Sequence, residues 1–438
     1  MKPLLFLLVL SSALNALPQV PIPVSSLWKS ETFRKQFTAS YGIDAAVEPR
    51  ISPEEKQILD AVAGKMQEED RNGAILKLKE NIRLSDSPAL QFTLANLLTE
   101  ENRTAEAVPH FEKAVSLYPS FRDAYRNLAL ALVQEGRTRE AMEPLVRAIE
   151  LRAADGLTYG LLAYVHSDAG QYASALQAYR QAQLLMPDEW QWKLGEANTL
   201  LALEAYSAAA KHFGELIARQ PENEQLWLAQ ADAFLADGKI EQAIANREIV
   251  RGMDKLNPDE RLVLGHLYLS IDLPNPALDC YLESIADVEP AAAMEALNRL
   301  IAARQWKQAE TLIPAMPVTG PEVKRAKAFI QIQSGEIPAG IRTLEHVVSK
   351  NPLDFEALLM LGKAYRQTGQ WEKSTLILEQ AARGKTTEIE ALLMLGQVFA
   401  EQGRFDDAIQ TLEKAYRLQP NPSVSEYIAA IRSLQRHS

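Results

Sequence analysis

The sequence contains very little cysteine and no excess of positive charge. Cys280 is the single cysteine among 438 residues, which excludes an intrachain disulfide framework and any metal site built on several thiolates. Lysine and arginine together number 46 against 57 acidic residues, which gives a formal net charge of −11. Nucleic-acid binding depends on basic side chains that neutralise phosphates, so we do not expect this acidic chain to bind nucleic acid.

The chain also lacks the short motifs of common enzyme classes. Its six histidines include no pair three or four residues apart, the spacing with which one helix face holds a metal ion. No phosphate-binding GxxxxGK[ST], dinucleotide-binding GxGxxG or nucleophile-bearing GxSxG pattern occurs. We therefore predict no catalytic residue, no cofactor and no bound metal, and a protein that is not an enzyme.

One apolar run stands at the start of the chain. Leu4–Leu10 follows a lysine and precedes a stretch of small residues, which is the order of a secretory signal peptide. The apolar stretch Leu4–Leu17 is shorter than the roughly 20 residues that cross a bilayer. We predict that residues 1–16 are a signal peptide cut after Ala13 or Ala16; an uncleaved anchor and a buried helix are the alternatives. No cysteine follows the run, so a lipoprotein is excluded and the periplasm is the expected location.

The sequence repeats itself with a period of 34 residues. Twelve residues before each repeated alanine stands a small residue. Four residues after it stands an aromatic or apolar residue, with Arg247 as the exception. The period shortens after residue 277 and returns to 34 before Ala408, which gives about eleven repeats in all. The alanines that define the uninterrupted part are Ala107, Ala141, Ala175, Ala209, Ala243 and Ala277.

Each repeat has the pattern of two amphipathic helices. In the last repeat we predict helices over Glu390–Gln402 and Asp406–Leu418, joined by a turn at Gly403. Small residues let two helix backbones cross closely, and the aromatic residues fill the space beside them. Because pairs of this length cannot bury their apolar faces alone, we expect them to stack into a solenoid.

Two C-terminal repeats share one pattern of small, aromatic and turn residues. Its residues are Leu361, Gly362, Tyr365, Gly369, Trp371 and Ala381, then Leu395, Gly396, Phe399, Gly403, Phe405, Ala408, Ala415 and Pro420. With this pattern the repeats resemble the tetratricopeptide repeat over most of the chain. The resemblance implies an all-α, right-handed α-solenoid of about eleven helix pairs, with a concave wall formed by the first helix of each pair. It also implies binding of a protein or peptide partner rather than catalysis. The unit at Ile301–Pro317 departs from the pattern because it is short and lacks the usual Leu-Gly start.

Proline, glycine and helix-start residues divide the chain further. Pro314, Pro317 and Pro321 mark a possible joint where the period shortens, although a degenerate repeat within one continuous superhelix explains them equally well. Ser52 and Asn257, each followed by proline, predict helix starts. The predicted segments are a Pro-rich spacer with a short amphipathic helix at 17–54, an N-terminal array at 55–289, a degenerate repeat or joint at 290–320, a C-terminal array at 321–422 and a capping helix at 423–438.

The spacer contains aromatic residues at helical spacing. Phe33, Phe37 and Tyr41 lie four residues apart, Trp28 precedes them, and basic residues share the opposite side of the predicted helix at 27–41. Such a helix can cap the first repeat, lie peripherally on an anionic membrane surface or contact a partner, and all three alternatives stay open.

A candidate binding surface follows from the inward positions of the first helices. Three consecutive repeats carry leucines seven residues apart, with a polar residue between them. An apolar strip edged by polar groups suits an amphipathic helix or an extended apolar peptide, whereas packing between repeats is the alternative. The three sets are Leu194, Asn198 and Leu201, then Leu228, Asp232 and Leu235, then Leu262, His266 and Leu269.

The sequence thus favours an exported, non-enzymatic scaffold or adaptor in a bacterial cell envelope. One alternative is a periplasmic accessory component of a TonB-like energy-transduction or envelope-assembly complex, with the N-terminal helix at the membrane. A second is a carrier or regulatory subunit of an exported enzyme. The oligomeric state stays open.

Overall fold

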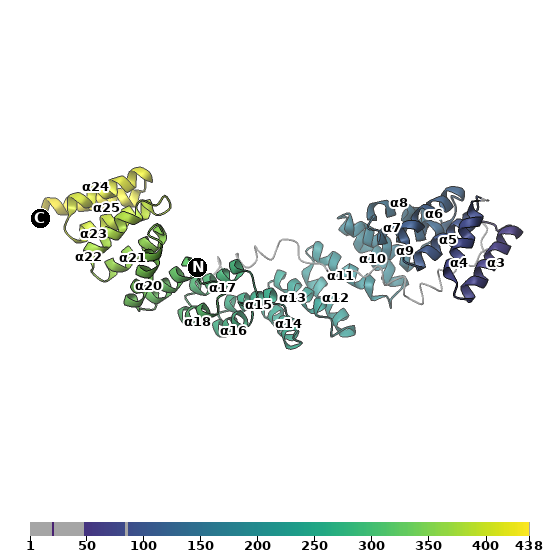
Figure 1. Ribbon diagram of the computed structural model, residues 1–438, viewed down its shortest axis with the longest axis horizontal. Helices are drawn as coiled ribbons and strands as arrows, with labels where there is room; N and C mark the ends of the chain where they lie inside the picture. The colour runs from purple at the N-terminus through teal and green to yellow at the C-terminus, as the bar shows by residue number, and fades with distance from the viewer. Residues whose placement is uncertain (1–19, 22–47, 84–85, 438) are drawn as a thin grey trace. The chain divides into compact units, whose positions relative to one another are not determined.

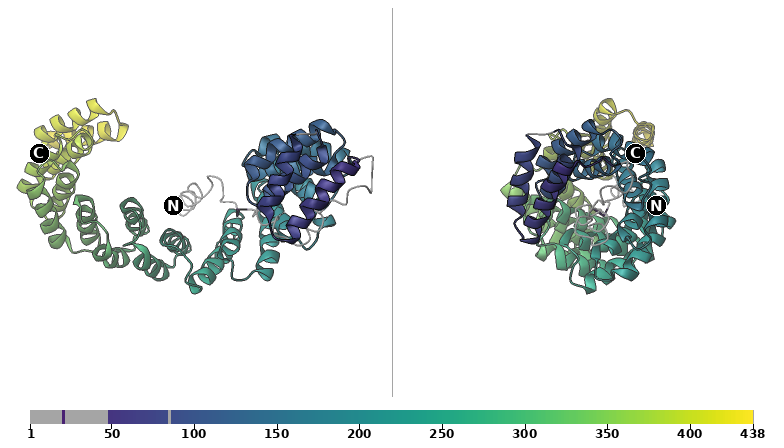
Figure 2. Two further views of the ribbon diagram at one scale, coloured as in Figure 1. Left: turned by 45° about the vertical axis from the view of Figure 1, so that its right-hand side comes forward. Right: turned by 90° about the vertical axis from the view of Figure 1, so that its right-hand side faces the viewer.

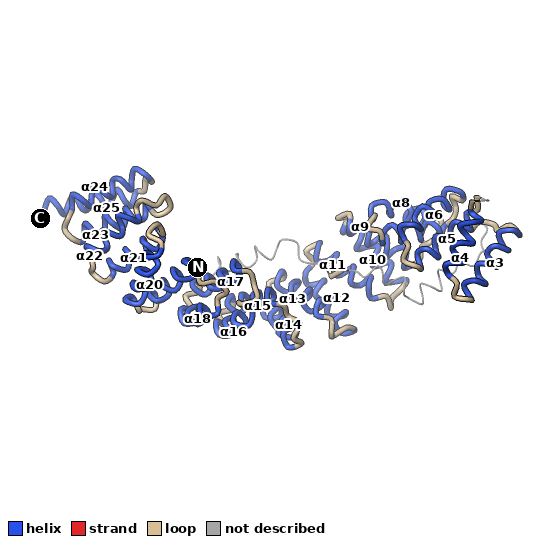
Figure 3. Tube along the Cα trace, in the orientation of Figure 1, coloured by secondary structure: helices blue, strands red, loops and turns tan. Residues whose placement is uncertain are grey.

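Short helices joined by tight turns make up the regular structure of the chain (Figure 1). The computed structural model describes residues 20–21, 48–83 and 86–437, and these residues contain no strand. Figure 3 shows the alternation of helix and loop along this trace. Eleven consecutive helix pairs and one final helix occupy the described ranges, which confirms the predicted all-α fold of about eleven pairs with an added C-terminal helix.

The helices belong to two compact units, one within residues 10–255 and one within residues 256–438. In each unit, helices that follow one another along the chain pack side by side (Figure 2). The first unit contains α3 (Pro53–Gln67), α4 (Arg71–Ile82), α5 (Pro88–Glu100), α6 (Thr104–Leu117), α7 (Arg122–Gln134), η2 (Thr138–Ala141) with α8 (Met142–Glu150), α9 (Gly156–Asp168), α10 (Tyr172–Leu185), α11 (Trp190–Ala202), α12 (Tyr206–Arg219), α13 (Glu224–Ala236) and α14 (Ile240–Gly252).

The second unit begins with a pair of ordinary length. Its boundary with the first unit, between Lys255 and Leu256, lies inside the predicted array at 55–289. It contains α15 (Pro258–Ser270), α16 (Pro274–Ser284), α17 (Pro290–Ala302), α18 (Trp306–Leu312) with η3 (Ile313–Ala315), α19 (Pro321–Gln333), α20 (Ile337–Lys350), α21 (Phe355–Gln367), α22 (Trp371–Ala381), α23 (Glu388–Glu401), α24 (Phe405–Leu418) and α25 (Pro422–His437).

The helix starts follow the signals in the sequence. At α3 the Ser52 hydroxyl accepts from the Glu55 amide and the Glu55 carboxylate accepts from the Ser52 amide, a complete capping box. At α15 the Asn257 side chain accepts from the Glu260 amide at 2.8 Å. These contacts satisfy backbone N–H groups that the first helical turn leaves without partners, so both predicted starts are confirmed.

The turn inside most pairs requires one residue in the left-handed conformation. Gly238 adopts φ 74° between α13 and α14, and Gly403 adopts φ 74° between α23 and α24. Glu204 takes the same role between α11 and α12 with φ 58°, although a residue with a Cβ adopts that conformation at a cost. Glycine is therefore favoured but not required at this turn.

The core follows the 34-residue period of the sequence, and we call the series of equivalent positions in successive repeats the ladder. All six alanines of the uninterrupted ladder are completely buried, and so are the aromatic rings of Tyr179, Phe213 and Tyr281 four residues after three of them. A Cβ added at Gly195 would lie 2.3 Å from the Tyr179 ring, which shows how closely α11 passes the second helix of the preceding pair.

The irregular repeat is short but continuously packed. α18 has only 7 residues before η3, because Pro314 and Pro317 interrupt the second helix. One buried apolar cluster nevertheless includes Leu262, Leu297, Met316 and Ile330, on both sides of this segment. Whether residues 290–320 act as a joint, and hence the division into two arrays there, stays a prediction.

The last helix covers the end of the second unit. Ile428 and Ile431 of α25 are buried in the same apolar cluster as Leu412 of α24. On its exposed side, Arg432 donates to Glu413 and the Gln435 amide donates to Asp406 at 2.8 Å. α25 thus covers an apolar face and presents a polar one, as a capping helix of stacked repeats requires.

Candidate functional site

The predicted leucine positions lie on first helices of three pairs, but they are not equivalent in their surroundings. Leu194 and Leu201 of α11 are buried in one apolar cluster of the first unit. On α13 of the same unit Leu235 is buried and Leu228 is half-buried. The third set lies in the second unit, where Leu262 and Leu269 of α15 join a separate cluster.

The polar residues between these leucines differ in how their side chains are satisfied. Asp232 accepts from Arg247 of α14, fifteen residues later in the same pair. His266 is at the equivalent place in the next repeat, and its Nδ1 lies 2.7 Å from the hydroxyl of Tyr281, again fifteen residues later. Asp232 and His266 are therefore held inside their own helix pairs, and a role for them in binding a partner stays a prediction.

Burial sets the electrostatics of both pairs. Loss of solvent raises the pKa of Asp232 and lowers that of Arg247, while the attraction between the two charges acts in the opposite direction. For His266, burial and then the nearby Arg299 lower the pKa to about 4. His266 is consequently neutral at pH 7, where its ring stacks edge-on against Tyr281 with centroids 5.4 Å apart.

Asn198 is the exception among the three polar positions. The residue fifteen positions later is Phe213, whose buried ring offers no polar group. Asn198 is only 3% exposed, and its Nδ2 instead donates to the main-chain carbonyl of Val20 at 2.7 Å. Its Oδ1 has no hydrogen-bond partner among the described residues. Asn198 thus differs from Asp232 and His266, because its buried amide donates to a main-chain oxygen while its own oxygen has no partner among the described residues.

Val20 occupies the apolar space beside this amide. Its side chain is 8% exposed and belongs to the cluster that contains Leu194 and Leu201, whereas Pro21 is exposed. A segment 178 residues away in sequence thus shares an apolar cluster with two of the predicted leucines and bonds to the polar residue between them. We define Val20, Leu194, Asn198 and Leu201 as the Asn198 site.

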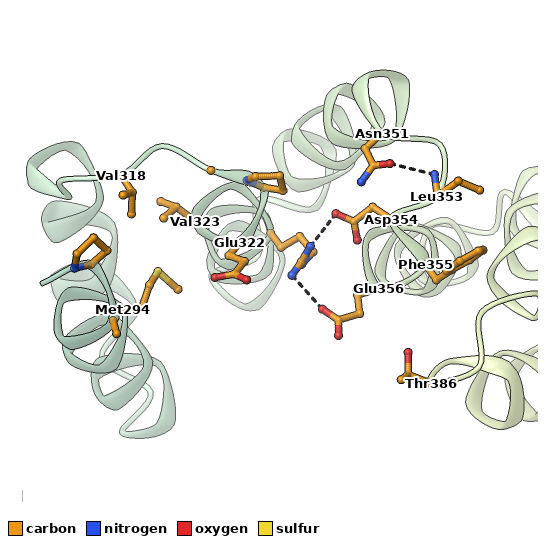
Figure 4. A pocket seen from close by; sticks show the side chains of 15 residues that line it. Met294, Val318, Glu322, Val323, Asn351, Leu353, Asp354, Phe355, Glu356 and Thr386 are labelled. Atoms are coloured by element: carbon orange, nitrogen blue, oxygen red, sulfur yellow. Dashed lines mark hydrogen bonds and ion pairs between the residues drawn. The ribbon is translucent and has the colours of Figure 1, made fainter.

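A second concavity lies in the second unit, among α17, α19 and the start of α21 (Figure 4). Its volume is about 770 Å³, and Met294 and Val323 contribute apolar surface. On its other side the Arg325 guanidinium contacts Asp354 at 2.7 Å and Glu356 at 3.0 Å. The lining also includes Glu322, so three carboxylates face one guanidinium and the pocket is acidic overall.

The aromatic residues predicted as an N-terminal contact, Trp28, Phe33, Phe37 and Tyr41, lie outside the described residues, as does the predicted signal peptide at 1–16. Over the described ranges, no group of three histidine, cysteine or acidic side chains could hold a metal ion. None of the helices in those ranges is long and apolar enough to span a membrane.

Family models decide what these repeats are. Models of the tetratricopeptide repeat match residues 92–156, 158–189, 194–255, 326–388 and 389–422, more than half of the chain. The chain belongs to the tetratricopeptide repeat family. The resemblance drawn from the sequence is therefore confirmed, and the chain is a scaffold of the kind that mediates protein–protein interaction. No curated protein sequence matches the chain.

Several solved structures are similar to the chain. A tetratricopeptide repeat protein from Parabacteroides merdae has 17% identity, with a match over 56% of this chain and 98% of that one and a TM-score of 0.39. MamA from Desulfovibrio magneticus has 17% identity over 37% and 92%, with a TM-score of 0.35. YrrB, described as a TPR protein with an unusual peptide-binding site, has 19% identity over 43% and 95%, with a TM-score of 0.38.

The sequence did not indicate Val20 as part of the site. A proline-rich spacer does not show where it docks, and the contact joins residues far apart along the chain. A signal was nevertheless present, since Arg247 and Tyr281 supply polar groups to Asp232 and His266, whereas Phe213 supplies none to Asn198. Comparison of positions fifteen residues apart would have identified Asn198 as the amide without an internal partner.

Proposed function

We propose that this tetratricopeptide repeat protein is an exported, non-enzymatic adaptor that binds an extended peptide segment of a partner along the first helices of its pairs. The bacterial cell envelope, and within it the periplasm, is the location that the order of residues 1–16 favours. The partner is a protein or peptide, because the acidic chain carries no excess of basic residues for phosphates.

One observation carries the proposal. The Asn198 amide donates to a main-chain carbonyl in an apolar site on a first helix. Every peptide has main-chain carbonyls, so a buried amide donor can hold an extended segment whatever its sequence. The leucines beside the amide then select apolar side chains. Grooves that bind extended peptides combine main-chain hydrogen bonds, which contribute affinity, with side-chain contacts, which contribute specificity.

The neighbouring helices supply further surface for such a segment. Trp190 and Trp227 pack partly buried against the cluster that contains Leu194 and Leu201. Leu228 of α13 is half-buried and keeps apolar surface exposed. Large apolar side chains that are only partly covered contribute most when a partner removes them from water.

Capture of the partner from the native host tests the proposal. Cells that express the tagged chain are treated with a crosslinker, and captured proteins are identified for the wild type, Asn198→Leu and Asn81→Leu. Asn81 is the matched control because, among the described residues, its side chain bonds to Lys77 O within its own helix α4, at 2.7 Å. We expect a partner that wild type and Asn81→Leu capture and Asn198→Leu loses, with all three equally helical by circular dichroism.

Two outcomes count against the proposal. A partner that Asn198→Leu retains in full places the binding surface elsewhere on the chain. Recovery of the protein in the cytoplasmic fraction, with residues 1–16 still attached, contradicts export. Sequencing the N-terminus of the protein from a periplasmic extract gives the second result directly.

A further inference from the structure

We infer that Val20 is an internal placeholder in the Asn198 site, and that the site's external ligand is an extended peptide with a branched apolar residue that displaces it. The inference rests on the proposed function, because it names the ligand class and the control of the same site. Four features support it: the contact itself, the unsatisfied oxygen of Asn198, the different state of the equivalent positions in the next two repeats, and the place of Val20 in the sequence.

The contact shows what the site accepts. Val20 puts a β-branched side chain into the cluster with Leu194 and Leu201 and its carbonyl on the Asn198 amide. A short branched side chain is thus accommodated in this cluster. The same contact shows that a main-chain carbonyl reaches the amide while the side chain is buried.

The unsatisfied oxygen shows what the placeholder does not provide. Asn198 offers one donor group and one acceptor, and Val20 engages only the donor. A buried polar atom without a partner costs free energy that a better ligand recovers. In extended backbone the N–H and C=O of one residue point to the same side, so an external peptide can bond both atoms of the Asn198 amide. Such a peptide binds more tightly than Val20 does.

Comparison with Asp232 and His266, the equivalent residues of the next two repeats, shows that only Asn198 of the three lacks a polar partner within its own helix pair. Asp232 accepts a hydrogen bond from Arg247, and His266 is hydrogen-bonded to Tyr281; in both cases the partner lies in the same helix pair. Only at Asn198, among these three positions, does an apolar ring, Phe213, leave the polar side chain to a segment outside the pair. The site therefore depends on a peptide, internal or external, in a way that its two neighbours do not.

Val20 also remains attached under the predicted processing. A cut after Ala13 or after Ala16 leaves it in the mature chain, within a few residues of the new N-terminus. Because Val20 is tethered to the chain, it competes for the site at an effective concentration on the order of millimolar. An external ligand of low affinity does not displace it. The placeholder thus covers apolar surface until a stronger ligand arrives.

The test uses a fluorescent peptide with the sequence of residues 17–24, Leu-Pro-Gln-Val-Pro-Ile-Pro-Val. Its binding is followed by anisotropy with the full-length wild type, with Val20→Lys, and with Val20→Lys combined with Asn198→Leu. We expect Val20→Lys to bind the peptide about tenfold more tightly than the wild type, because the tethered competitor is gone. Addition of Asn198→Leu should remove the gain, and a peptide with lysine in place of the valine that corresponds to Val20 should not bind.

Three results would overturn the inference. Equal peptide affinity of wild type and Val20→Lys means that Val20 does not occupy the site in solution. Failure of Val20→Lys to bind any peptide means that the site does not take this ligand class. A wild-type dimer, found by light scattering and lost in Val20→Lys, means that the segment comes from a second copy. In each case Asn198-dependent capture of a host partner would still support the proposed function, so the two failures are distinguishable.

Discussion

Arg247 donates to the carboxylate of Asp232 inside a helix pair, at a ladder position where the neighbouring pairs of the same ladder bury Phe213 and Tyr281. Both members of the ion pair are largely shielded from water, with side-chain exposures of 4% and 14%. An ion pair in such a place gains attraction but loses the hydration of two charges, so its net contribution to stability is small.

Removal of one member should therefore be far more harmful than removal of both. Asp232→Leu leaves a buried guanidinium without this carboxylate, and we expect the free energy of unfolding to fall by about 3–5 kcal/mol. Asp232→Leu with Arg247→Phe restores the apolar pattern of the ladder and should match or exceed the wild type. Urea unfolding followed by circular dichroism measures all three chains. A double variant as unstable as Asp232→Leu would show that the ion pair itself stabilises the fold.

Buried His266 makes the stability of the second unit depend on pH. Its folded pKa of about 4 lies below the ordinary value of 6.5, so the unfolded chain binds more protons between these values. The contribution of the neutral ring is complete above pH 6.5 and is lost as the pH falls to 4, by at most about 3 kcal/mol. We expect the difference in unfolding free energy between wild type and His266→Gln to shrink over this window. A difference that stays constant from pH 7 to pH 4 would contradict this titration.

Two glycines near α14 should respond in opposite ways to the same substitution. A Cβ at Gly238 or at Gly252 would meet no atom within 4 Å, so space does not distinguish them. Gly238 has φ 74°, where alanine costs about 1 kcal/mol, whereas Gly252 is the last helical residue of α14. We expect Gly238→Ala to destabilise the first unit and Gly252→Ala to stabilise it by about 0.5–1 kcal/mol. Thermal unfolding of the two variants checks the signs, and equal shifts would rule out backbone conformation as the cause.

The period of the sequence was sufficient to predict the fold because each repeat meets the same local requirements. The buried alanines, the close approach at Gly195 and the capping box at Ser52 all depend on residues within one or two helix pairs. A period of 34 residues arises when every repeat makes the same contacts with its neighbours, so such short-range packing can be recognised in the sequence. For the same reason the last two helices of the array were predicted to within two residues at each end.

The candidate site was predicted only in part because its decisive contact is not periodic. The leucine pattern placed Leu194, Asn198 and Leu201 together on α11, where the structure has them. It treated Asp232 and His266 as equivalent to Asn198, although their partners at 247 and 281 hold them inside their own pairs. The contact of Asn198 with Val20 spans 178 residues and leaves no trace in a repeat pattern.

The proposals for this chain depend on Asn198 holding a main-chain segment, and thiol labelling tests that contact directly. Cys280 is completely buried, so a cysteine introduced at an exposed position is the first thiol to react. Val20 is 8% exposed, so we expect a maleimide to label Val20→Cys slowly. Leu76 of α4 is 59% exposed, so Leu76→Cys should react fast. Val20→Cys combined with Asn198→Leu should approach that fast rate, because the hydrogen bond that holds the segment is lost. Labelling of Val20→Cys as fast as that of Leu76→Cys would contradict the structure of the Asn198 site.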